Sequence, residues 1–265
     1  MTDKLSQLRH ILHEMGGVLI AYSGGVDSTF LLKVAADTLG DKAVAVTARS
    51  LTYPEREYEE GREIAKALGA RHITIVSEEL EIPEFSDNPP RRCYYCKKEL
   101  FTKLLQIARQ EGLQFVVDGS NLDDETDFRP GRDAAREFGI RSPLSEAGLT
   151  KGDIRRFSKD LCLPTWDKPS FACLASRFPY GDKITPEKLH RVAEAEDFLH
   201  TLGFKQVRVR DHQDLARIEV VPDDIKRFCE EDIRIQVSER LRKIGYNYVA
   251  LDLFGYRSGS MNEIL

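Results

Sequence analysis

The stretch VLIAYSGGVDS, residues 18–28, decides the fold class, because an apolar strand pattern runs directly into a glycine pair and then into a helix pattern. Two consecutive glycines let the backbone turn tightly and expose N–H groups, and the N-terminus of the following helix favours an anion. The loop is not a Walker A loop, since no Gly-Lys-Ser/Thr follows it, and it is not a G-x-G-x-x-G loop. The stretch therefore predicts a phosphate site at the loop of residues 23–28, with a glycine turn that only joins strand and helix as the alternative.

Helix and strand patterns alternate over the first part of the chain, as in a parallel sheet with crossover helices. After about residue 166 the pattern changes to a helix, a hairpin made of KQVRVR and LARIEV, a further helix and a final strand, YVALDL. We therefore expect an α/β fold, with a doubly wound parallel sheet in residues 1–165 and a smaller C-terminal α+β domain in residues 166–265. The expected strands of the first domain are 17–22, 43–47, 72–76 and 114–118; the expected helices of the chain are 3–15, 27–39, 54–69, 95–111, 131–138, 150–160, 185–202 and 223–243.

The composition narrows the function classes. With 41% hydrophobic and 31% charged residues, the 265-residue chain has the composition of a globular protein. Its net charge of −5 argues against a large nucleic-acid footprint, so we expect no nucleic-acid partner. The longest apolar runs are strand-sized, and the N-terminus has a helix pattern without the apolar core of a signal peptide. We expect a cytoplasmic protein without a membrane partner.

The glycine loop resembles the PP-loop of ATP pyrophosphatases, whose S-G-G-x-D-S motif it matches residue for residue. Enzymes of this superfamily cleave ATP between the α- and β-phosphates and transfer AMP to a substrate oxygen, which makes that oxygen a leaving group. The resemblance implies ATP and Mg²⁺ as cofactors. It also implies that Asp27 lies near Mg²⁺ and that pyrophosphate is held by Ser23, Gly24, Gly25 and Ser28.

A second loop, DGSNLDDETDFRPG at residues 118–131, follows the strand pattern QFVV. Ligands of doubly wound folds bind at the carboxyl edge of the sheet, where this loop is expected. We assign Gly119 to nucleotide binding and Asp124 to a second Mg²⁺ contact, since Mg²⁺ is held by one or two carboxylates together with phosphates. A solvated acidic loop is the alternative.

Two of the five cysteines, Cys93 and Cys96, stand three positions apart in RRCYYCKKELF, residues 91–101. In a cytoplasmic chain such a pair is metal-bound, catalytic or reduced more often than it is a structural disulfide. The spacing alone leaves a redox disulfide, a zinc site and an iron–sulfur site open, although no second C-x-x-C or H-x-x-x-H completes a four-ligand zinc site. Cys162 and Cys229 lie in apolar helix patterns, and we expect them to be core thiols.

Five motifs extend the resemblance over nearly the whole chain. They are SGGVDS, DGSNLDDETDFRPG, SRFPYG, VRVR and LDLFGYRSGSMN, and they occur in this order in the LarE family of ATP-dependent sulfur transferases. These enzymes make a pyridinium bisthiocarboxylic acid mononucleotide, the precursor of the nickel-pincer nucleotide cofactor of lactate racemase. The resemblance implies a pyridinium-3,5-biscarboxylic acid mononucleotide as substrate and a homo-oligomer such as a hexamer.

The family supplies sulfur in two ways, from a sacrificed cysteine or from a three-cysteine [4Fe-4S] cluster that carries an extra sulfide. Aligned through SRFPYG, the sacrificed cysteine falls at Ala172, one place before Cys173. The chain thus departs from the sacrificial pattern, and the resemblance implies that Cys93, Cys96 and Cys173 are catalytic ligands of a cluster, with sulfide or another external sulfur source. Sacrifice of Cys173, an iron–sulfur tRNA thiolase, an ammonia-using ATP pyrophosphatase and a nucleotide-binding regulator with a zinc site remain alternatives.

The substrate would need cations, and the second domain offers them at strand spacing. Arg208 and Arg210 in VRVR point to the same side of a strand, and two guanidinium groups on one side suit a phosphate. A solvated alternating strand is the alternative. The resemblance adds Ser176, Arg177 and Glu196 to this anion site.

Overall fold

The computed structural model describes residues 3–126, 130–169 and 172–257. The chain divides into unit 1, Met1–Phe85 with Arg91–Phe171, and unit 2, Ser86–Pro90 with Ala172–Leu265. The expected boundary at 165/166 thus differs from the observed division, which falls six residues later and assigns a short earlier segment to unit 2. Asn88 shows why: its buried Nδ2 donates hydrogen bonds to the carbonyl oxygens of Phe178 at 3.3 Å and Pro179 at 2.6 Å. These hydrogen bonds make the segment Ser86–Pro90 part of unit 2.

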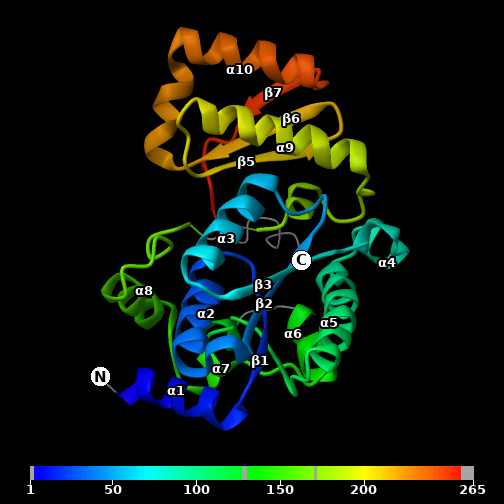
Figure 1. The fold of residues 1–265 in the computed structure, drawn as a ribbon. Coiled ribbons are helices and arrows are strands. Elements are labelled where there is room, and N and C mark those ends of the chain that lie inside the picture. The colour runs from blue at the N-terminus through cyan, green and yellow to red at the C-terminus, as the bar shows by residue number, and fades with distance from the viewer. Residues whose placement is uncertain (1–2, 127–129, 170–171, 258–265) are drawn as a thin grey trace. The chain divides into compact units, whose positions relative to one another are not determined.

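Unit 1 contains a four-stranded parallel sheet with the order β3-β2-β1-β4 (Figure 1). The strands are β1 (Val18–Ala21), β2 (Ala43–Arg49), β3 (Arg71–Val76) and β4 (Phe115–Val117). The first strand is apolar throughout and lies between β2 and β4, as expected for a parallel strand that is covered on both faces.

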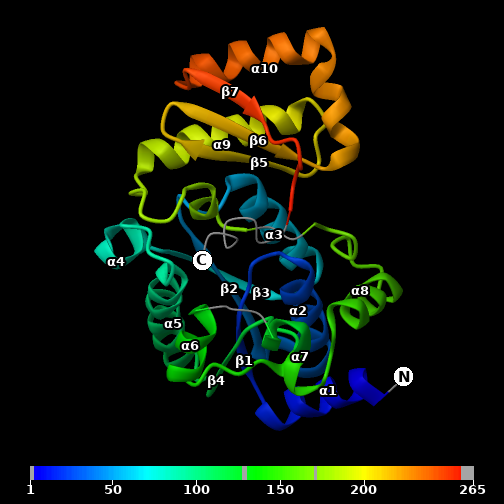
Figure 2. The ribbon, with the colours of Figure 1, turned by 180° about the vertical axis from the view of Figure 1, so that it is seen from behind.

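The helices of unit 1 cover both faces of this sheet. Val18 and Ile20 pack in one cluster with α1, α2 and α8, whereas Leu19 packs in another with α5 and α6. Figures 1 and 2 show these two groups of helices on opposite sides of the strands. The helices are α1 (Asp3–Met15), α2 (Val26–Leu39), α3 (Glu55–Ala67), α4 (Pro83–Ser86), α5 (Arg92–Gln110), α6 (Pro130–Glu137), α7 (Pro143–Glu146) and α8 (Lys151–Asp160), with short 3-10 segments η1 (Gly40–Lys42), η2 (Glu79–Glu81) and η3 (Leu122–Thr126).

Unit 2 is a three-stranded sheet with helices packed on it, in the order β5-β6-β7. Strands β5 (Val207–His212) and β6 (Leu215–Val220) form the predicted hairpin, which turns at Gln213 with a φ of +62°. Strand β7 (Tyr248–Leu251) returns parallel to β6 after a helical crossover. The core is formed by α9 (Pro186–Thr201) and α10 (Glu231–Ile244) against the inward side chains of the strands.

The prediction of a doubly wound α/β domain followed by a smaller α+β domain is therefore confirmed. One expected helix, 223–243, is wrong as a single element. It is a 3-10 segment, η5 (Pro222–Cys229), followed by α10, because Glu230 between them has extended backbone angles of −67° and 131°. The short helices α4 and α7 were not predicted. Of the helices in the described residues, none combines the length and apolar character that crossing a bilayer requires.

Candidate functional site

The glycine-rich loop joins β1 to the N-terminus of α2, as the sequence predicts. Gly24 has a φ of +63°, in the left-handed region that glycine adopts without steric cost. Gly25 is extended and is the residue before the helix begins. Ser28 Oγ lies 3.1 Å from Ser23 Oγ and accepts a hydrogen bond from Ser23 N at 3.3 Å. The predicted phosphate ligands therefore lie in one loop, and their role in binding stays a prediction.

Helix α3 supports this loop through a close backbone contact. A Cβ atom at Gly24 would lie 2.9 Å from the Cα of Gly61, so a side chain does not fit there. The hydroxyl of Tyr22 donates to Gly61 O at 3.1 Å, and burial raises the pKa of Tyr22 to about 12. The hydroxyl of Tyr53 donates to Ser23 O at 2.7 Å. Sequence reasoning missed this support, because a glycine in a helix pattern does not reveal which surface it meets.

Asp27 stands in the first turn of α2 and has two differently placed carboxylate oxygens. Oδ2 forms an ion pair with Nζ of Lys151, while Oδ1 is buried and has no hydrogen-bond partner among the described residues. A buried carboxylate oxygen without a partner is costly unless a cation or a donor reaches it, so Asp27 fits the predicted Mg²⁺ contact. Lys151 was missed because it is 124 positions away in the chain, where the one local signal is the helix start at Thr150 and Asp153.

The second loop lies against the same helix N-terminus. A Cβ atom at Gly119 would lie 3.1 Å from the backbone nitrogen of Ser28, which shows how closely this loop approaches the phosphate loop. Asp124 Oδ2 accepts a hydrogen bond from Asn121 N at 3.0 Å, so this carboxylate helps to shape the loop. Residues 127–129 of the motif lie outside the described residues. A metal contact by Asp124 stays a prediction.

Lys168 is a second lysine at the phosphate loop that sequence reasoning did not identify. Its Nζ lies 2.8 Å from Glu57 Oε2 and 2.9 Å from Glu60 Oε2, on α3, and 3.5 Å from Gly24 O. Because two carboxylates surround this ammonium group, it connects α3 to the loop and is not an isolated cation.

Cys93 and Cys96 lie in the first and second turns of α5, which begins at Arg92, three residues earlier than expected. The pair is thus inside the helix, and the spacing of three residues places both thiols on one side of it. Cys93 is exposed and Cys96 half-buried, and neither forms a disulfide. Two thiols that are outside any disulfide and one helical turn apart fit two ligands of a metal cluster.

Cys173 is the residue before the 3-10 segment η4 (Leu174–Arg177); it is exposed and forms no disulfide. Its Sγ accepts a hydrogen bond from Ala175 N at 3.4 Å. Within either unit, the described residues contain no group of three or more His, Cys, Asp or Glu side chains placed to hold a metal ion. The expectation that Cys162 and Cys229 are core thiols is wrong: both are exposed, because each follows the last buried turn of its helical segment.

In unit 2 a buried ion pair lies beside the predicted anion site. Arg177 is fully buried, and its Nε and one Nη donate to the two oxygens of Glu196 at 2.7 and 2.9 Å. Glu196 also accepts from Val209 N at 2.8 Å. Burial alone raises the pKa of Glu196, but the charge of Arg177 and its hydrogen bonds outweigh burial and hold this pKa below its ordinary value. The two predicted residues are therefore brought together as one ion pair.

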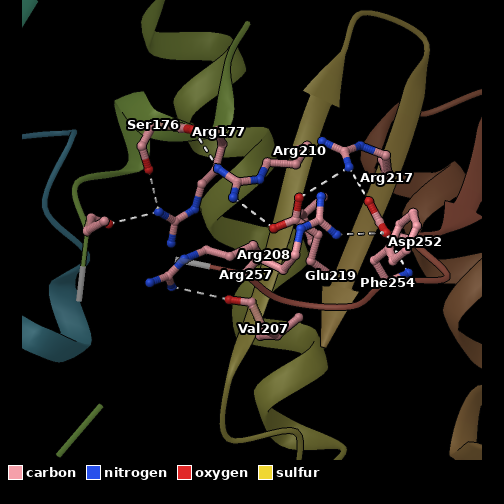
Figure 3. Close-up of polar contacts among 12 residues, drawn as sticks. Ser176, Arg177, Val207, Arg208, Arg210, Arg217, Glu219, Asp252, Phe254 and Arg257 are labelled. Carbon is pink, nitrogen blue, oxygen red and sulfur yellow. Dashed lines mark hydrogen bonds and ion pairs between the residues drawn. The ribbon is translucent and has the colours of Figure 1, made fainter. Parts of the chain in front are cut away.

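Arg208 and Arg210 are 6% and 4% exposed, which excludes a solvated strand (Figure 3). Arg210 donates to Ser176 O at 2.7 Å and to Glu219 Oε2 at 2.7 Å, so much of its guanidinium group is already bound. Burial, and then the charge of Arg177, lowers the pKa of Arg208 to about 10. Burial therefore opposes the charge of Arg208 most, and the neighbouring Arg177 adds to this effect.

Two further arginines extend this cluster. Arg217 lies 3.3 Å from Glu219 Oε1 and also contacts Asp252, while Arg257 lies 3.8 Å from Asp252. Sequence reasoning did not single out Arg217, whose pairing with a carboxylate on a different element has no local signal. Figure 3 shows these side chains beside β5 and β6. Among the described residues the cluster holds five arginines (Arg177, Arg208, Arg210, Arg217 and Arg257) and three carboxylates (Glu196, Glu219 and Asp252).

Comparison with known proteins gives two kinds of relative. The chain is 39% identical, over 100% of its length and 96% of the relative, to the pyridinium-3,5-bisthiocarboxylic acid mononucleotide synthase of Lactiplantibacillus plantarum. The chain belongs to this synthase family, the LarE family. An uncharacterized protein of Synechocystis is 46% identical over 100% of this chain and 99% of the relative.

Argininosuccinate synthase of Methanocaldococcus jannaschii is 27% identical over 55% of the chain and 40% of the relative, which places the LarE family chain in the PP-loop ATP pyrophosphatase superfamily. No protein-family model matches the chain.

Proposed function

We propose that the protein is an ATP-dependent sulfur transferase that adenylates the carboxylates of pyridinium-3,5-biscarboxylic acid mononucleotide and converts them to thiocarboxylates in nickel-pincer nucleotide cofactor biosynthesis. The observation that carries this proposal is the similarity to the named synthase along the whole chain. The phosphate loop supports it independently, since the buried Oδ1 of Asp27 is left for a cation.

The phosphate loop and the arginine cluster have separate roles in this proposal. Ser23, Gly24, Gly25, Ser28 and Gly119 hold the phosphates of ATP, and Asp27 and Asp124 hold Mg²⁺. A substrate carboxylate attacks the α-phosphorus, and the bond to the β-phosphate oxygen breaks with release of pyrophosphate. The acyl-adenylate then accepts sulfur at its carbon and releases AMP. Ser176, Arg177, Glu196, Arg208 and Arg210 form the site for the phosphate of the mononucleotide.

Cys93, Cys96 and Cys173 would hold a [4Fe-4S] cluster, since thiolates are its usual ligands and none of the three is in a disulfide. When bound, such a cluster with an open iron supplies a renewable sulfide, so the enzyme turns over more than once. The family resemblance further supports a homo-oligomer, such as a hexamer, that acts in the cytoplasm and takes sulfide or another external sulfur compound.

The first experiment separates adenylation from sulfur transfer. Asp27→Asn should abolish formation of AMP from ATP and substrate while leaving any iron content unchanged. Cys93→Ala should retain substrate-dependent pyrophosphate release and lose sulfur transfer. Unchanged AMP formation in Asp27→Asn would remove this carboxylate from the reaction.

The second experiment measures iron and acid-labile sulfide per chain after reconstitution without oxygen. About four irons, lost on replacement of any one of the three cysteines, are expected. The exposed Cys173 offers a competing source of sulfur. If the protein binds no iron and instead loses one sulfur atom at Cys173 during the reaction, the cluster is excluded and the cysteine is consumed.

A further inference from the structure

The phosphate loop has no lysine in its own sequence, and the structure supplies one from a distant segment. Residues 23–28 contain no cation, unlike a Walker A loop, where a lysine reaches the β- and γ-phosphates. Lys151 is the first residue of α8, yet its Nζ contacts Asp27 in the first turn of α2. A cation therefore stands where the sequence of the loop has none.

The two oxygens of Asp27 place this ammonium group next to a bound phosphate. Oδ2 contacts Lys151, and the buried Oδ1 has no hydrogen-bond partner among the described residues. Asp27 would hold a metal ion through Oδ1 while Oδ2 keeps its contact with Lys151, and such an ion would bring bound phosphate to the carboxylate that the ammonium group contacts. An ammonium group has three N–H donors, and the described residues record Asp27 as the one side-chain partner of Lys151 Nζ.

Hydrogen bonds fix the backbone of Lys151 and so help to hold its side chain at Asp27. Lys151 N donates to Asp123 Oδ2 at 2.8 Å, which connects α8 to the second loop of the site. Thr150 and Asp153 form a reciprocal capping box at the start of α8, and Lys4 binds Asp153 at 2.7 Å. Lys151 thus contacts both loops of the proposed ATP site, Asp123 through its backbone and Asp27 through its side chain.

Lys168 does not fill the same role. It also approaches the loop, but Glu57 and Glu60 already lie 2.8 and 2.9 Å from its ammonium group. Its side chain is 11% exposed, compared with 30% for Lys151, so it is a buried link to α3. Of the two lysines, Lys151 is the one with donors available to a ligand.

We propose that Lys151 is a catalytic residue that binds the β- and γ-phosphates of ATP and stabilises the leaving pyrophosphate. The inference rests on the proposed ATP chemistry and extends it. As the substrate oxygen bonds to the α-phosphorus, the bond from phosphorus to the bridging oxygen breaks, and its electron pair leaves with pyrophosphate. The positive charge of the Lys151 side chain balances part of this new negative charge.

The test is binding of inorganic pyrophosphate and of AMP to the full chain by titration calorimetry in the presence of Mg²⁺. Lys151→Gln should weaken pyrophosphate binding by about 10- to 100-fold, as expected for loss of a charge-assisted hydrogen bond, and leave AMP binding unchanged. Lys151→Arg should recover most of this affinity. Lys33→Gln is the matched control: Lys33 lies on α2, pairs with Asp37 at 2.7 Å and is 29% exposed, but it does not contact the loop residue Asp27 in the described structure.

Each outcome decides the inference. Equal pyrophosphate affinity in wild type and Lys151→Gln, with a normal melting temperature, would overturn it, as would an equal loss for AMP and pyrophosphate. A variant that does not fold leaves Lys151→Arg as the test, and weak pyrophosphate binding there, in a protein with a normal melting temperature, would also contradict a role for the positive charge. If the wild-type protein binds neither ATP nor pyrophosphate, the proposed ATP chemistry itself fails, and the lysine inference falls with it.

Discussion

Glu196→Gln removes one charge from the buried ion pair of unit 2, and the cost follows from the burial. Arg177 is 0% and Glu196 4% exposed, and the carboxylate accepts both donors of the arginine as well as Val209 N. Removing one partner of a buried pair costs about 3–5 kcal/mol, because the other charge stays in the interior. For a unit of about 100 residues, this lowers the melting temperature by at least about 12 °C.

The assay is urea unfolding followed by circular dichroism and by tryptophan fluorescence. The single tryptophan, Trp166, belongs to unit 1, so its fluorescence reports that unit, whereas circular dichroism reports both. We expect Glu196→Gln to shift the transition of unit 2 and to leave the tryptophan transition in place. Glu194→Gln is the control on the same helix: it breaks a pair with Arg240 that is 2.8 Å long and about half exposed, which should cost less than about 1 kcal/mol.

The pH dependence provides a second check. Arg177 holds the pKa of Glu196 below its ordinary value of 4.5 despite burial, so ionisation of Glu196 stabilises the folded state above that value. This contribution is lost as the pH falls below 4.5 and through the lowered pKa. The stability difference between wild type and Glu196→Gln should therefore shrink in acid. The reasoning would be refuted if Glu196→Gln lost no more unfolding free energy at pH 7 than Glu194→Gln. It would also be refuted if the stability difference between wild type and Glu196→Gln grew in acid.

Two further changes test the support of the phosphate site. Gly24→Ala places a Cβ within 2.9 Å of the Gly61 Cα at a φ of +63°, so we expect the free energy of unfolding to fall by about 1–2 kcal/mol. We also expect ATP binding, measured by calorimetry, to be at least about tenfold weaker. Normal ATP affinity would show that the close contact is not required. Thr150→Ala removes the cap shared with Asp153 and should cost about 1 kcal/mol in urea unfolding of unit 1. It should also weaken pyrophosphate binding, since the cap fixes the backbone of Lys151, and unchanged affinity would separate the cap from ligand binding.

The part of the site that could be predicted from the sequence is the part encoded locally. An apolar strand, two glycines and a helix start follow one another within residues 18–28, so the loop and its position were predictable. The ammonium group of Lys151 comes from 124 positions away, and the Gly24–Gly61 contact joins two elements whose packing no local pattern specifies. Periodicity identifies which side of an element a residue occupies. It does not identify what covers that side.

Strand β5 also has a feature that its local sequence does not determine, namely whether its arginines are buried or exposed. The alternation in VRVR correctly placed Arg208 and Arg210 on one side, but alternation is equally typical of a strand with a solvated face. Arg210 is buried with hydrogen bonds to Glu219 on the neighbouring strand and to Ser176 in a separate segment. Burial of such side chains can therefore be predicted only when their partners on other elements are known.

Burying the charged side chains of the arginine cluster costs unit 2 folding free energy, which suggests a role for the cluster other than stability. Replacing buried ion pairs by apolar side chains of similar volume is often neutral or stabilising, so stability alone does not explain such a cluster. Burial and the charge of Arg177 lower the pKa of Arg208 to about 10, which means that the surroundings oppose its charge more than they favour it. An anion bound beside Arg208 would reverse that balance. The proposed phosphate of the substrate therefore accounts for a charge arrangement that folding by itself does not favour.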